Sequence, residues 1–106
     1  MITAIVRFKL PADMTQAKAA ALFQGSAPKY QGLPGLVRKY YLYDAHTQTG
    51  GGCYLWKSRA DADRVYTAAW KTMITERYGA APDISFFETP VVVDNTSGQT
   101  TADAAE

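Results

Sequence analysis

The sequence predicts a single α+β domain built on an antiparallel sheet. Three observations lead to this fold class: an apolar and polar alternation at the N-terminus, two segments with helical features, and a central hairpin pattern rich in aromatic residues. A chain of 106 residues with 47% hydrophobic and 20% charged residues also has the composition of one ordinary globular domain.

The first strand is predicted at Ile2 to Leu10, because every second residue from Ile2 is apolar. A helix should follow from Gln16 to about Gln24 or beyond, with the side chain of Thr15 as its N-cap. Gly25 and Pro28 are expected to make the end of this helix irregular.

The second and third strands are predicted at Leu36 to Tyr43 and at Cys53 to Lys57. The polar segment from Asp44 to Gly51 is expected to be the loop of the hairpin that joins them. The glycines at positions 50–52 would give that loop its freedom of turn geometry.

The second helix is predicted to start after Ser58, with Asp61 three residues later as an approximate capping box, and to end at Gly79. Its helical spacing places one apolar stripe along Ala62, Val65, Tyr66, Ala69 and Met73, with Trp70 and Ile74 alongside.

A fourth strand is predicted at Ile84 to Thr89, and a short fifth strand at Val91 to Val93 on an edge. The domain is expected to span residues 1–94, with residues 95–106 as a polar C-terminal tail.

The order strand, helix, two strands, helix, strand gives a ferredoxin-like sheet with both helices on one face. The second strand nevertheless carries large side chains on both faces, with Tyr40 and Leu42 on one and Val37, Tyr41 and Tyr43 on the other. Two apolar faces and one set of helices imply a second cover, and a sheet-to-sheet homodimer is the simplest.

Several classes of protein are disfavoured by composition. A net charge of +1 removes the main argument for a nucleic-acid binder. The single cysteine, Cys53, and the single histidine, His46, cannot form an internal disulfide or a Cys/His zinc site. The N-terminus lacks the apolar core of a signal peptide and the sequence lacks a membrane-spanning run, so a cytoplasmic protein is expected.

Aromatic residues gather around the predicted hairpin and second helix, and Lys39 lies within them. One interpretation is a hydrophobic core plus a dimer interface. The other is a pocket for a flat organic ligand. In the second interpretation Lys39 and Trp56 are the candidate catalytic residues, and the candidate substrate-binding residues are Tyr41, Tyr54, Tyr66 and Trp70.

Several short sequence motifs resemble those of one protein family. They are Gly-Leu-Pro-Gly-Leu-Val-Arg-Lys-Tyr-Tyr at 32–41, Gly-Gly-Gly-Cys-Tyr-Leu-Trp-Lys-Ser at 50–58, Trp70 with Arg-Tyr-Gly at 77–79, and Glu-Thr-Pro-Val-Val-Val-Asp at 88–94. Together they resemble the YdhR-like monooxygenases of the dimeric α/β-barrel superfamily, which are related to the antibiotic-biosynthesis monooxygenases.

This resemblance implies a homodimer whose two sheets form a shared barrel, with one ligand cavity per subunit. It also implies oxidation of phenolic polycyclic molecules by dioxygen without flavin, haem or metal. The role of a tryptophan on the third strand carries over to Trp56, and a supporting role carries over less directly to Tyr66. No asparagine of this chain matches the one expected in the cavity.

Alternatives from other classes remain open. A non-catalytic ligand-binding or sensor dimer needs the same pocket. An RNA-recognition module shares the element order, but its third-strand motif is missing here. A haem-degrading relative needs a helical histidine, whereas His46 is predicted in a loop.

Overall fold

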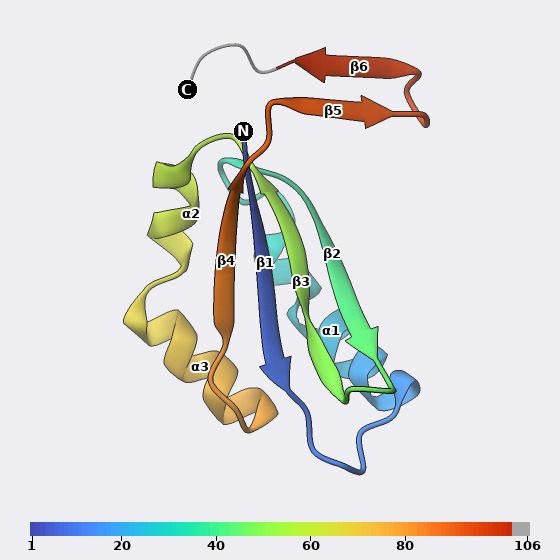
Figure 1. Ribbon diagram of the computed structural model, residues 1–106. Coiled ribbons are helices and arrows are strands. Elements are labelled where there is room, and N and C mark those ends of the chain that lie inside the picture. Colours follow the sequence, from blue (N-terminus) through green and yellow to red (C-terminus); the bar gives the residue numbers. More distant parts are fainter. Residues whose placement is uncertain (103–106) are drawn as a thin grey trace.

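A four-stranded antiparallel sheet in the order β2-β3-β1-β4 forms the centre of the computed structural model, which describes residues 1–102 (Figure 1). The elements, in chain order, are β1 (Ile2–Lys9), α1 (Gln16–Tyr30), β2 (Leu36–Asp44), β3 (Thr49–Trp56), α2 (Arg59–Val65), α3 (Ala68–Tyr78), β4 (Asp83–Glu88), β5 (Val91–Asp94) and β6 (Gln99–Ala102). The predicted ferredoxin-like α+β fold is therefore confirmed.

The core lies between the sheet and the helices. Ile2, Ala4, Val6 and Phe8 of β1 are all buried, as the alternation predicts. They pack in one cluster with side chains of all three helices, so the helices cover a single face of the sheet.

The predicted helix caps are present, but the second predicted helix is two helices. Ser58 caps α2 by accepting from the Asp61 backbone N–H, and Gly79 ends α3 with a φ of +90°. A break at Tyr66 and Thr67 turns the chain, and Thr67 caps α3. The buried stripe of α3 is consequently Trp70, Ile74 and Tyr78, and Ala69 of the predicted stripe is exposed.

The glycine run is part of β3 instead of the loop predicted there. Gly50 pairs with Phe8, Gly51 with Arg7 and Gly52 with Val6 on the neighbouring β1. A Cβ atom on Gly51 would overlap the carbonyl oxygen of Val6, so the two backbones pass closer than any side chain allows. The turn between β2 and β3 is correspondingly short, at residues 45–48.

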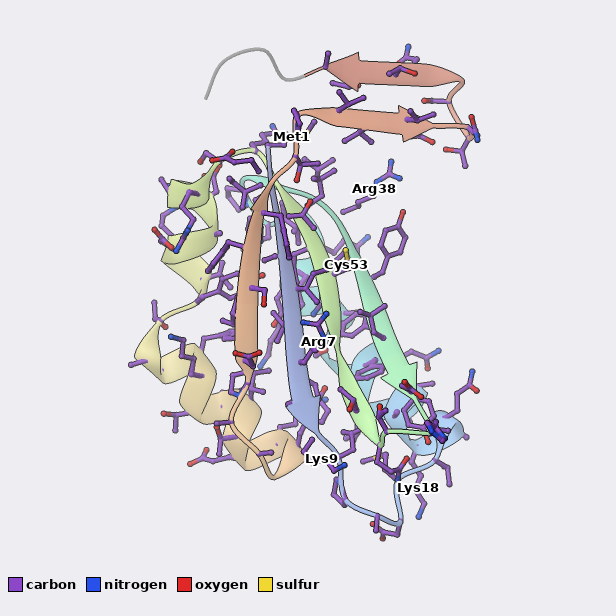
Figure 2. The ribbon with its side chains drawn as sticks, in the orientation of Figure 1. Met1, Arg7, Lys9, Lys18, Arg38 and Cys53 are labelled. Carbon is purple, nitrogen blue, oxygen red and sulfur yellow. The ribbon has the colours of Figure 1, made fainter. Side chains whose placement is uncertain are left out.

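Within residues 1–102 no helix covers the second face of the sheet (Figure 1), and several large apolar side chains are exposed on it. Tyr40, Leu42 and Phe87 are 54%, 40% and 55% exposed, although each belongs to a strand. Figure 2 shows Arg7 and Cys53 on this same face, in front of the strands. The expectation of two apolar faces is thus confirmed, except that a bulge between Leu36 and Arg38 leaves Val37 exposed.

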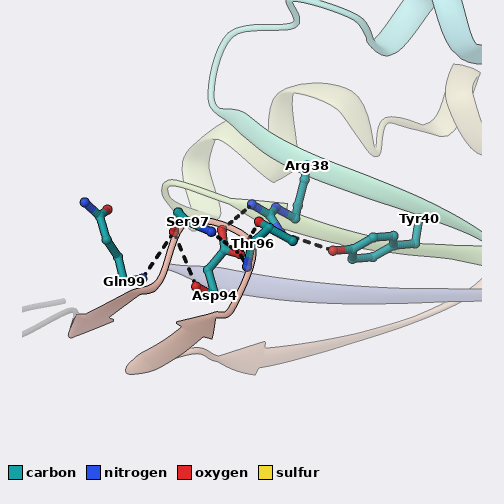
Figure 3. Close-up of polar contacts among 6 residues, drawn as sticks. All are labelled: Arg38, Tyr40, Asp94, Thr96, Ser97 and Gln99. Carbon is teal, nitrogen blue, oxygen red and sulfur yellow. Dashed lines mark hydrogen bonds and ion pairs between the residues drawn. The ribbon is translucent and has the colours of Figure 1, made fainter.

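The C-terminal segment forms a hairpin that projects beyond the main sheet (Figure 1). β5 and β6 pair only with each other, and residues 95–98 make the turn. Arg38 Nη2 lies 3.1 Å from Asp94 Oδ2, while the other oxygen of Asp94 accepts from the Thr96 backbone N–H (Figure 3). Residues 95–102 of the predicted tail thus have regular structure, and residues 103–106 lie outside the described residues.

We expect Gly51→Ala to lower the free energy of unfolding by about 3 kcal/mol, because the new methyl group must push β1 and β3 apart. Gly98→Ala is the control, since its position in the hairpin turn is open and any backbone strain at its φ of +72° stays local. Chemical denaturation of both variants tests this, and equal losses of stability would contradict the close approach of the two strands.

Truncation after Asp94 is expected to shift the melting temperature little. None of the buried core residues comes from the hairpin, and the Arg38–Asp94 ion pair survives the truncation. Differential scanning calorimetry measures the shift. A fall of more than about 5 °C, which corresponds to about 1 kcal/mol in a domain of this size, would show that residues 95–106 support the fold.

Candidate functional site

Lys39 lies on the face of the sheet that the helices cover, directly across from Tyr54 of β3. Its Nζ is 3.5 Å from the centre of the Tyr30 ring, 3.8 Å from that of Tyr41 and 4.6 Å from that of Tyr54. We call these three rings the tyrosine box. They come from the last turn of α1, from β2 and from β3, so three elements enclose one amino group.

Two backbone features place Lys39 in the box. The bulge between Leu36 and Arg38 sets the register in which Lys39 pairs with Tyr54. Gly52 leaves the space that the box needs, since a Cβ atom there would lie 2.9 Å from Tyr54 Cε1 and 3.3 Å from Lys39 Cε.

The faces of the rings, and not their hydroxyl groups, meet the amino group. Tyr30 Oη accepts from Trp70 Nε1 at 2.9 Å. Ser26 donates to the Phe23 carbonyl oxygen at 3.0 Å, so the 2.7 Å contact between Ser26 Oγ and Tyr41 Oη is a bond that the tyrosine donates. The hydroxyl groups of Tyr30 and Tyr41 are therefore held in place by partners other than Lys39.

Burial controls the protonation of the site. It lowers the pKa of Lys39 to about 7, because the ammonium form loses water. Burial acts in the opposite direction on the phenols, and raises the pKa of Tyr54 and Tyr41 above the ordinary tyrosine value. Tyr41 and Tyr54 consequently remain neutral at physiological pH.

Two hollows meet at Lys39. An enclosed hollow of about 20 Å³ lies toward α3, and Tyr30, Lys39, Tyr41 and Tyr54 are among its lining residues. A more open groove of about 280 Å³ lies between the end of α1 and β2, and Tyr30, Lys39 and Tyr41 line this one too. Lys39 and two of its rings therefore separate the interior hollow from the outer groove.

A larger groove of about 550 Å³ runs further along α1 and β2. It shares Phe23 and Tyr41 with the interior hollow, but neither Lys39 nor Trp56 lines it. Its volume suits a small organic ligand, whereas the titratable chemistry lies at the smaller groove.

Trp56 and its neighbours continue the cluster behind Tyr54. The Trp56 ring is parallel to that of Tyr54, with centres 6.0 Å apart, and has no exposed surface. Its Nε1 donates to Tyr66 Oη at 3.1 Å, and the Tyr66 ring packs against Trp70 at 4.8 Å. The six candidate residues thus share one cluster, in which Lys39, Tyr41 and Tyr54 line a hollow and the other three do not.

Tyr30 is not among the residues that the sequence predicts for the site, because Gly25 and Pro28 predict an irregular end of the helix before it. The helix continues through Pro28 to Tyr30. Ala19, Phe23, Ser26 and Tyr30 follow one another at helical spacing, and this pattern would have revealed the tyrosine.

The other features singled out by sequence contribute little to this site. His46 is exposed in the β2–β3 turn, where its backbone N–H donates to Asp44 Oδ1 at 2.9 Å. Within residues 1–102, no three His, Cys, Asp or Glu side chains gather as a metal site would require. No helix in that range has the length and apolar character to cross a membrane.

The family model described as "Putative mono-oxygenase ydhR" matches residues 5–88 of the chain. This match contains the tyrosine box and all six candidate site residues. No curated protein sequence matches the chain.

Solved structures share the fold at low sequence identity. SnoaB, a cofactor-independent oxygenase from Streptomyces nogalater, is 16% identical with a TM-score of 0.60, over 83% of this chain and 91% of its own. A monooxygenase from the gene ActVA-Orf6 of Streptomyces coelicolor, in complex with nanaomycin D, is 18% identical with a TM-score of 0.63. The match covers 83% of this chain and 86% of that monooxygenase. An antibiotic biosynthesis monooxygenase, described as putative, from Deinococcus radiodurans is 12% identical with a TM-score of 0.62, over 89% and 97%.

We expect Tyr66→Phe to lower the free energy of unfolding by about 1–3 kcal/mol, because the buried Trp56 N–H loses its acceptor. Thr47→Val removes a hydroxyl that donates to Thr49 Oγ1 in the exposed β2–β3 turn, and should change stability little. Urea denaturation compares the two. A Tyr66→Phe variant as stable as the parent would show that this bond contributes nothing.

Proposed function

Because the chain belongs to the ydhR mono-oxygenase family, we propose that it oxidises a flat phenolic molecule with dioxygen, without flavin, haem or metal. The observation that carries this proposal is the enclosure of Lys39 by three aromatic rings beside a groove. The cofactor-independent oxygenase among the structural neighbours supports the same reaction class.

The proposed reaction uses the electrons of the substrate itself. A phenol that has lost its proton is electron-rich enough to give an electron to dioxygen. Conversion of a ring C–H to a quinone carbonyl then consumes one dioxygen and releases one water. The protein needs to supply orientation, exclusion of water and stabilisation of charge.

The residues of the cluster supply these in different ways. Lys39 would lie beside the phenolic oxygen, and the rings of Tyr41 and Tyr54 would hold the substrate plane. Trp56, Tyr66 and Trp70 would fix Tyr54 from behind, through the contact between Trp56 and Tyr54 and the bond from Trp56 to Tyr66. The interior hollow of about 20 Å³ must widen for this, so the substrate would enter from the groove and displace the Lys39 side chain.

Oxygen uptake with a panel of hydroquinones and naphthols tests the function. We expect Lys39→Met to lower the rate about a hundredfold, the usual scale for loss of a charge-stabilising or proton-transferring group. Lys57→Met, which changes an exposed lysine directly after β3, should match the parent. Tight binding of the panel without oxygen uptake would favour the alternative, a non-catalytic ligand-binding or sensor dimer.

The second cover of the sheet would be another copy of the chain. The exposed Tyr40, Leu42 and Phe87 belong to the helix-free face, where Ile5 and Leu55 are also only partly covered. A homodimer that buries this face in a shared barrel would remove that apolar surface from water. We expect an obligate interface of more than about 2,000 Å² in total, and light scattering that gives a monomer mass at micromolar concentration would contradict it.

A further inference from the structure

Among residues 1–102, no acidic side chain accompanies Lys39 in its enclosure. The residues that line the interior hollow include neither Asp nor Glu. The side chain takes part in no ion pair among the described residues, and its polar end faces three aromatic rings. A buried ammonium group ordinarily has a carboxylate beside it, so the missing counter-ion is the feature to explain.

The titratable and charged groups around the amine come from every element that packs against it. α1 contributes Tyr30, β2 contributes Tyr41 and β3 contributes Tyr54, all of them phenols whose ring faces meet the amine. α3 contributes Tyr78 and Arg77, and β1 contributes Phe8, which does not titrate. Besides Lys39, Arg77 is the one charged residue among the described residues that line the hollow, and its Nη2 donates to the Leu22 carbonyl oxygen at 2.6 Å.

These surroundings tolerate both protonation states of the amine. Burial without a carboxylate opposes the ammonium form and lowers the pKa of Lys39 to about 7. The ring faces at 3.5 and 3.8 Å favour the ammonium form, because a cation is attracted to the negative face of an aromatic ring. A group that is stable with and without its proton, beside an open groove, suits proton transfer.

We propose that Lys39 accepts the hydroxyl proton of a bound aromatic alcohol, so that the site selects phenols and naphthols over aromatic carboxylates. In this step the O–H bond of the ligand breaks and its electron pair stays on oxygen. The lone pair of Lys39 Nζ forms the new N–H bond, and the resulting ammonium and phenolate are each other's counter-ion. This inference rests on the proposed function for its substrate but needs no oxygen chemistry.

The selection follows from counting protons. A neutral alcohol and a neutral amine give the ammonium–phenolate pair with no proton gained or lost. An aromatic carboxylate has no proton to give. When the amine of Lys39 is neutral, it must first take up a proton from the solvent before it can form an ion pair with the carboxylate. Above about pH 7, carboxylate binding should weaken about tenfold per pH unit while alcohol binding stays constant. Below that pH the alcohol must release a proton, and its binding should weaken by the same factor.

The experiment measures binding of 2-naphthol, 2-naphthoate and 2-methoxynaphthalene to the whole chain without oxygen, from pH 6 to pH 9. We expect 2-naphthol bound at pH 8 to show the absorption band of its anion. Free 2-naphthol remains neutral at this pH, which lies more than one unit below its own pKa. We also expect opposite pH slopes for 2-naphthol and 2-naphthoate around pH 7. The methyl ether has the same rings without the proton, and should bind at least tenfold more weakly than 2-naphthol.

Lys39→Arg supplies the matched variant, since a guanidinium keeps its charge throughout this pH range. In that variant 2-naphthoate binding should lose its pH dependence, and 2-naphthol should lose its advantage over the carboxylate. Lys57→Met should reproduce the parent. The slopes of the parent protein alone decide the question if the arginine variant does not fold.

Three results would overturn the inference: equal binding of 2-naphthol and its methyl ether, a bound naphthol with the spectrum of the neutral form, or 2-naphthoate binding that is constant from pH 7 to pH 9. Failure of the proposed function looks different. The expected slopes without any oxygen uptake would leave the proton transfer intact and refute the oxygenase. Full oxygen uptake by Lys39→Met would refute the proton transfer and the proposed role of Lys39 in the reaction, but would leave the oxygenase activity itself established.

Discussion

The close approach of the β1 backbone to the three glycines of β3 is the constraint on which the remaining structure depends. β3 lies between β1 and β2, and its residues 50–52 carry no side chains. Gly51 lets the backbone of β1 come near, and Gly52 leaves space for the Tyr54 ring and the Lys39 stem. A side chain at either position would separate strands or empty the tyrosine box, so the same glycines support both the sheet and the site.

The aromatic cluster satisfies two requirements at once. Its rings fill the space between sheet and helices, while its polar tips need partners away from water. Trp56 donates to Tyr66, Trp70 donates to Tyr30, and Tyr41 donates to Ser26. No buried side-chain nitrogen or oxygen within residues 1–102 lacks a partner. Such pairing holds each ring at a fixed angle, and leaves the amine of Lys39 as the group whose charge can change.

Local patterns in the sequence were sufficient for the fold and for part of the site. The alternation from Ile2 predicts β1, and the Ser58 and Asp61 pair predicts the start of α2. The predicted hairpin brings the strand of Lys39 beside that of Trp56, but it leaves the register open, and the structure pairs Lys39 with Tyr54. The predictions that were wrong concern residues whose usual structural preference is outweighed by tertiary packing. Glycines usually mark turns, but those of β3 relieve crowding between strands. A proline such as Pro28 usually ends a helix, because it has no N–H to donate to the carbonyl oxygen four residues earlier. Here the helix continues, because Gln24 and Pro28 both face outward, where water can bind the Gln24 carbonyl oxygen instead. The polar strand β6 has no apolar signal at all, since it pairs only through its backbone with β5.

Both tryptophans of the chain belong to this one cluster, and the indole N–H of each is bound by a tyrosine hydroxyl. Their ultraviolet emission therefore originates beside the tyrosine box, with no third indole elsewhere to add background. A molecule that enters the groove and moves Tyr30 or Tyr54 changes the surroundings of Trp70 or Trp56 directly. The protein thus carries its own optical probe, and unlabelled chain at low concentration is enough to follow occupancy in real time.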